Sequence, residues 1–130
     1  MKIYSPKKGT YALPDSVYYR VVYLVKDYPR LLSEADALLE ATPPQTETPE
    51  IQRQRNIKAT ETTNIKYSMM MKDVRDIEEA LIDTVPPDAR NAIMKSIISG
   101  ASYPVDKGRS TYAQYKQRFL YTLAERRHLI

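Results

Sequence analysis

The stretch STYAQYKQRFLYTLAERR, residues 110–127, has the clearest helical period in the chain. When these residues are placed at 100° intervals, four aromatic and apolar side chains share one side of the helix: Tyr112, Tyr115, Phe119 and Leu123. Amide, guanidinium and phenol side chains share the other side: Gln114, Gln117, Arg118 and Tyr121. The first side predicts packing on a core. The second predicts a surface that contacts base edges or a partner protein.

Two shorter elements precede this helix. Residues 101–109 contain Pro104 and Gly108 and predict a loop, after which Ser110 is well placed as the N-cap of the last helix. Residues 87–99 carry isoleucines and alanines at helical spacing behind Pro86 and Pro87. They predict a short buried helix that Gly100 ends.

A long helix is expected from residue 57, and more firmly from residue 64, to the two prolines. Its apolar side chains alternate steps of three and four: Tyr67, Met70, Val74, Ile77 and Leu81. Acidic residues fill its polar side: Asp73, Asp76, Glu78, Glu79 and Asp83. Two of these carboxylates could hold magnesium, but a solvated acidic face is the favoured interpretation.

The amino-terminal part predicts one apolar stripe over residues 16–41, with Asp15 or Ser16 as cap and a kink or restart around Pro29. Residues 1–12 are interpreted as a loose basic arm, and residues 42–56, rich in proline and threonine, as a linker. No segment has a period of two. The predicted fold is all-α, a single domain over residues 1–130 built as a small bundle of about four helices, with the linker after the first helical unit.

Composition argues against several function classes. The chain has no cysteine, a single histidine at position 128 and three glycines, so neither a thiolate or paired-histidine metal site nor a glycine-rich phosphate loop is expected. We therefore expect no enzyme, no metal and no small-molecule cofactor. No apolar run is long enough for a membrane span, and no signal peptide is visible, which favours a cytoplasmic protein without membrane contact.

The formal net charge of +4 is concentrated near the carboxyl end. Residues 107–127 hold six lysines and arginines against one glutamate. Such a segment is typical of a phosphate-binding surface, although lysine and arginine in a last turn also solvate the helix and complement its dipole. Both interpretations stay open at this point.

The order PPDARNAIMKSIISG, loop, GRSTYAQYKQRFLYTLAERR resembles the carboxyl-terminal half of small phage and prophage regulators of the RinA and ArpU type, which are similar to the promoter-reading domain of sigma factors. Residues 26–39 also resemble the amino-terminal helix of such proteins. The resemblance implies a DNA-binding transcription regulator in a bacterial host cell, with residues 110–127 as its recognition helix. The loop at 101–109 stands where a helix-turn-helix has its bracing helix.

Under this hypothesis Gln114, Gln117 and Arg118 meet base edges, where glutamine suits adenine and arginine suits guanine. The remaining candidate residues are expected to contact the DNA backbone. Phosphate contacts are assigned to Lys107, Arg109 and Lys116, helped by Thr111 at the amino end of the helix.

The alternative is a non-catalytic helical scaffold or adaptor, in phage assembly or as a homodimer, that binds no nucleic acid. In that case Tyr121 joins Gln114, Gln117 and Arg118 in a protein interface, because tyrosine and arginine are enriched at binding hot spots. A third possibility is binding of RNA or single strands through the tyrosines, though packing roles for those rings are favoured.

Overall fold

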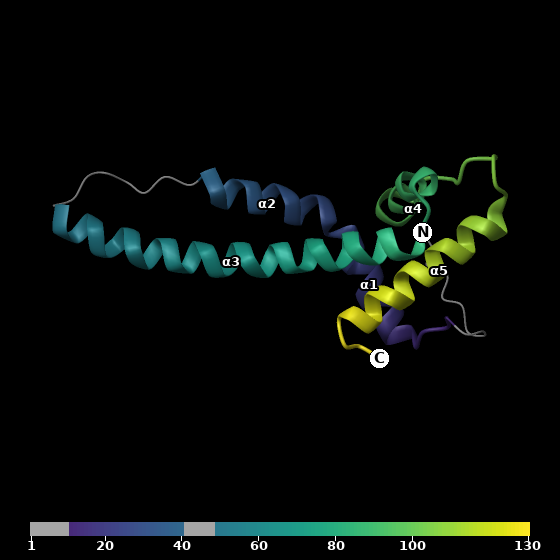
Figure 1. Ribbon diagram of the computed structural model, residues 1–130, viewed down its shortest axis with the longest axis horizontal. Coiled ribbons are helices and arrows are strands. Elements are labelled where there is room, and N and C mark those ends of the chain that lie inside the picture. Colours follow the sequence, from purple (N-terminus) through teal and green to yellow (C-terminus); the bar gives the residue numbers. More distant parts are fainter. Residues whose placement is uncertain (1–10, 41–48) are drawn as a thin grey trace. The chain divides into compact units, whose positions relative to one another are not determined.

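The computed structural model describes residues 11–40 and 49–130, with no side-chain description for residues 40–60. The described residues form helices and no strand, so the all-α prediction is confirmed. The helices follow one another as α1 Asp15–Lys26, α2 Tyr28–Glu40, α3 Pro49–Thr84, α4 Pro87–Ser99 and α5 Arg109–Arg126 (Figure 1).

The break predicted at Pro29 is present. Asp27 caps the carboxyl end of α1, and α2 begins at Tyr28 with Pro29 in its first turn, where a missing N–H costs nothing. The predicted side-chain cap of α1 is wrong. Pro14 is the N-cap, and its carbonyl accepts the amides of Val17 and Tyr18 at 3.0 and 2.9 Å.

The helix α3 begins at Pro49 rather than at residue 57, so residues 49–56 of the predicted linker are helical. Good helix formers follow the proline in the sequence EIQRQR, and a proline in the first turn is compatible with a helix. A sequence without an apolar period gave no helical signal here. The rest of the predicted linker, residues 42–48, and residues 1–10 of the predicted arm lie outside the described residues.

The chain divides into two compact units. The first combines Met1–Tyr28 with Arg75–Ile130, and the second is Pro29–Val74. In the first unit α1 packs against α4 and α5, and α4 also contacts α5. Its core consists of completely buried side chains from four helices: Val21, Val25, Ile77, Ile93, Phe119 and Leu123. Among the side chains described for the second unit, Leu31, Ala35 and Val74 are buried.

The connection between α4 and α5 is a loop, as predicted. Gly100 ends α4 in the left-handed conformation, with φ of 71°. The N-cap of α5 is Gly108, with φ of 81°, so the predicted cap at Ser110 is wrong and no side chain caps this helix. Ser110 lies inside the first turn and is exposed.

Side chains fix the conformation of this loop. The hydroxyl of Tyr112 donates a hydrogen bond of 2.6 Å to Asp106, and Tyr103 stacks on the ring of Tyr112 with 5.0 Å between centroids. Lys107 forms an ion pair with Asp88 in the first turn of α4. These contacts attach both ends of the loop to helices of the first unit.

Candidate functional site

The helix α5 is two-sided, as its period predicts. Tyr112, Phe119 and Leu123 are completely buried. On the opposite face Gln114 and Arg118 are exposed, and Gln117, like Tyr121, is half-buried. The buried row anchors the helix, so the outer face is presented by a rigid element.

Tyr11, just before α1, covers part of this outer face. Its ring meets that of Tyr121 edge to face, with centroids 5.3 Å apart, and the guanidinium of Arg118 lies 5.5 Å from the centroid of the Tyr11 ring. A cation over an aromatic face is attracted to it. Sequence reasoning assigned Tyr11 to a loose arm and missed this role, because one tyrosine outside any helical period carries no signal.

Lys107 does not stand free for a phosphate. Its ammonium pairs with Asp88 and lies 3.8 Å from Asp106. The pair raises the pKa of Lys107, and the Lys107 ammonium lowers the pKa of Asp88. The structure therefore gives this charge an intramolecular partner that no single-helix pattern shows, and its assignment as a phosphate contact stays a prediction.

The other predicted phosphate contacts differ in exposure. Arg109 is exposed in the first turn of α5, while Thr111 is half-buried there. Lys116 is half-buried, and burial, reinforced by the nearby cation of Lys26, lowers the pKa of its ammonium. Arg109 is thus the predicted contact best placed for a phosphate.

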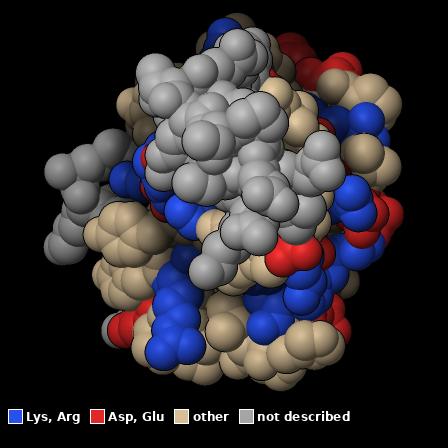
Figure 2. Space-filling view, turned by 90° about the vertical axis from the view of Figure 1, so that its left-hand side faces the viewer, with Lys and Arg blue, Asp and Glu red and all other residues tan. Residues whose placement is uncertain are grey.

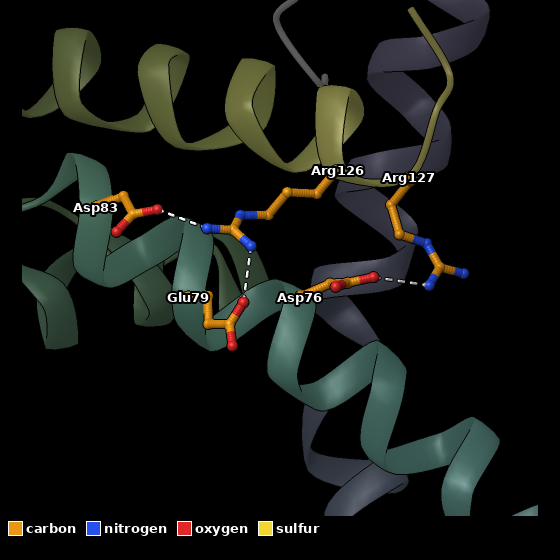
Figure 3. Close-up of polar contacts among 5 residues, drawn as sticks. All are labelled: Asp76, Glu79, Asp83, Arg126 and Arg127. Carbon is orange, nitrogen blue, oxygen red and sulfur yellow. Dashed lines mark hydrogen bonds and ion pairs between the residues drawn. The ribbon is translucent and has the colours of Figure 1, made fainter.

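The carboxyl end of α5 is tied to the acidic face of α3 within the first unit (Figure 3). The two terminal nitrogens of Arg126 contact Glu79 at 2.7 Å and Asp83 at 2.6 Å, and Arg127 contacts Asp76 at 3.1 Å. This corrects the interpretation of the α3 carboxylates as a merely solvated face. It also removes two arginines from the expected phosphate-binding charge.

Charges of both signs also lie side by side on the face that Figure 2 shows. In Figure 2, Lys and Arg side chains lie beside Asp and Glu side chains on the face toward the viewer. Of the six cations between residues 107 and 127, three carry intramolecular ion pairs: Lys107, Arg126 and Arg127. The local excess of positive charge in the sequence therefore overstates the charge available to a partner.

A cavity of about 820 Å³ opens beside the first half of α5. Its wall comes from two regions that are far apart in the sequence: residues 11–18 around the start of α1, and the loop between α4 and α5 together with the first part of α5. The lining side chains and backbone belong to Tyr11, Leu13, Tyr18, Ala101, Ser102, Tyr103, Pro104, Val105, Gly108, Arg109, Ala113, Lys116, Gln117 and Leu120. Three predicted site residues thus meet at this cavity, namely Arg109, Lys116 and Gln117.

Tyr18 is the most buried tyrosine of the cavity wall. It is 2% exposed, and its hydroxyl has no hydrogen-bond partner within the part of the chain that the structure describes. Burial raises the pKa of this phenol to about 12. Sequence reasoning assigned the early tyrosines to packing and missed the cavity, because a pocket between distant segments has no periodic signature.

Among the described residues, no group of three or more His, Cys, Asp or Glu side chains is arranged to hold a metal ion. No helix in the described part of the chain has the length and apolar character needed to cross a bilayer. Comparisons of the chain with protein-family models, curated proteins and solved structures give no match.

Proposed function

We propose that the protein is a DNA-binding regulator whose outer face of α5 enters the major groove. The observation that carries this proposal is the pair Gln114 and Arg118, which are exposed one helical turn apart on a helix whose opposite face buries Tyr112, Phe119 and Leu123 and half-buries Tyr115. A side chain that reads a base edge must project from a rigid support, and both residue types form paired hydrogen bonds with purines.

The amino end of α5 supports the same proposal. Gly108 caps the helix without a side-chain hydrogen bond, so the first-turn N–H groups are not engaged by a capping side chain. Arg109 is exposed beside them. Backbone donors, the helix dipole and one guanidinium together suit a phosphate of the DNA backbone. Lys107 contributes little, since Asp88 already neutralises it.

The test selects duplexes from a random pool with the full chain and then measures affinity by fluorescence anisotropy over a series of salt concentrations. Gln114→Ala combined with Arg118→Ala is expected to weaken binding of the selected duplex at least about tenfold, because each paired base contact contributes roughly 1–3 kcal/mol. Arg20→Ala is the matched control, since it removes an exposed guanidinium from α1. If the wild-type chain shows no salt-dependent affinity for any duplex, DNA binding is excluded.

The second candidate is a homodimeric adaptor, and the second unit supplies the observation that favours it. Leu32 and Leu39 on α2 are 37% and 64% exposed, and Ile65 and Met69 on α3 are 62% and 66% exposed. Leu32 and Leu39 are seven residues apart, and Ile65 and Met69 are four residues apart, so the two members of each pair lie on the same face of their helix. Light scattering discriminates the candidates: a dimer that Ile65→Lys dissociates favours the adaptor, and a monomer with duplex affinity favours the regulator.

A further inference from the structure

The cavity beside α5 has the size and the lining of a small-molecule site. Its volume of about 820 Å³ falls within the range of about 300–1,000 Å³ found for ligand pockets. Tyr11, Tyr18 and Tyr103 contribute aromatic rings to the wall, and Leu13 and Val105 contribute aliphatic surface. Such walls stack on or enclose a planar apolar body.

One cation in this wall, Lys116, has no carboxylate partner among the residues that the structure describes. Lys116 is half-buried, and none of the ion pairs found among the described residues involves it. The charged group that acts on it, Lys26, is another cation, and burial lowers the pKa of Lys116. Lys107 and Arg126, in contrast, both face carboxylates. A desolvated ammonium without a carboxylate is stabilised when an anion binds beside it.

The cavity wall also contains a tyrosine whose hydroxyl is buried. Tyr18 is 2% exposed, and among the described residues its hydroxyl has no hydrogen-bond partner. Buried polar groups without a partner are rare and call for a specific explanation. Arg109, which also lines the cavity, adds a second positive charge.

We propose that this cavity binds a small aromatic carboxylate, with its ring among Tyr11, Tyr18 and Tyr103 and its carboxylate paired with Lys116. The wall combines aromatic rings with the ammonium of Lys116, and this combination favours a ligand that has both a ring and a negative charge. A neutral aromatic molecule leaves the ammonium without a counter-ion, and an inorganic anion leaves the aromatic surface in contact with water. The proposal concerns a small ligand and does not depend on DNA binding.

Calorimetric titration of the full chain with 2-naphthoate and with its neutral analogue 2-naphthamide tests the proposal. We expect saturable binding of the carboxylate at least about tenfold tighter than that of the amide, the difference typical of a charge-assisted contact. Lys116→Met keeps the length of the side chain and removes its charge, so it abolishes this preference. Lys95→Met, which removes an exposed lysine from α4, leaves the preference unchanged.

A second variant separates loss of the site from loss of the fold. Ala113→Phe places a ring in the cavity from an exposed position on α5 and is expected to block both probes while the helical circular dichroism stays that of the wild type. Three results overturn the proposal. They are no saturable binding of 2-naphthoate at millimolar concentration, equal affinity for the two probes, and unchanged binding by a folded Ala113→Phe variant.

Discussion

Replacing Arg126 with methionine tests how strongly the carboxyl end of α5 is held on α3. The guanidinium bridges Glu79 and Asp83 through two nitrogens, at 2.7 and 2.6 Å, and these carboxylates raise the pKa of Arg126 further. Its side chain is 32% exposed, and the two acids are about half exposed, so solvent screens both pairs. Methionine keeps the aliphatic stem and removes only the charged head.

The magnitude follows from this geometry. An exposed ion pair contributes roughly 0.2–1 kcal/mol, and a guanidinium that is held by two carboxylates lies toward the upper end, so the loss of both pairs is expected to cost about 1–2 kcal/mol. Urea unfolding followed by circular dichroism measures this as a lower midpoint at unchanged slope.

A double-mutant cycle decides whether the ion pairs are the cause. Combining Arg126→Met with Asp83→Asn is expected to give a coupling free energy clearly above about 0.3 kcal/mol, the level at which independent sites add. High salt is expected to reduce that coupling, since screening weakens exposed pairs. A coupling within the additive range, or one that salt leaves unchanged, refutes the reasoning that electrostatic contacts hold this end of α5.

Two further predictions concern tyrosines of the first unit. Tyr112→Phe keeps the stack with Tyr103 and removes the hydrogen bond of 2.6 Å to Asp106, so thermal unfolding is expected to show a loss of roughly 1.5–3 kcal/mol, the range for a hydrogen bond to a charged group. Alkaline pH is expected to destabilise the fold. The pKa of Tyr18 is raised from 10.0 to about 12, so the neutral phenol is favoured in the native state, and its stabilisation is complete below pH 10 and lost as the pH rises toward 12. Urea midpoints that fall less between these pH values in Tyr18→Phe than in the wild type confirm the assignment, and identical falls contradict it.

Much of the architecture follows from patterns within single elements. The helix period of residues 110–127, the stop at Gly100 and the break before Pro29 each rest on neighbouring residues, and the structure has all three. The start of α3 was missed because residues 49–56 have helix propensity but no apolar stripe. The predicted N-caps were also wrong. The N-cap of α1 is Pro14 rather than Asp15 or Ser16, and the N-cap of α5 is Gly108 rather than Ser110, so neither helix has a side-chain cap.

The site was less predictable because its decisive contacts join residues that are far apart in the chain. The pairs of Arg126 with Glu79 and Asp83 span 47 and 43 residues, and the cavity brings residues 11–18 together with residues 101–120. A helical wheel shows which face a residue occupies. It does not show which opposite charge that face will meet. In sequence reasoning, Lys107, Arg126 and Arg127 therefore counted as available to a phosphate, although each forms an ion pair within the folded protein.

The distribution of these paired charges separates two tasks of α5. Its carboxyl end uses Arg126 and Arg127 to hold the helix on α3, and the loop before its amino end uses Lys107 to hold Asp88 of α4. Between these anchors, Arg109 at the amino end and Gln114 on the outer face are exposed, and neither forms part of the ion pairs described for this unit. Charges at the two ends therefore position the helix, while the segment between them remains accessible to a partner. Substitutions at the anchors should change stability first, and substitutions at Gln114 should change binding with little effect on stability.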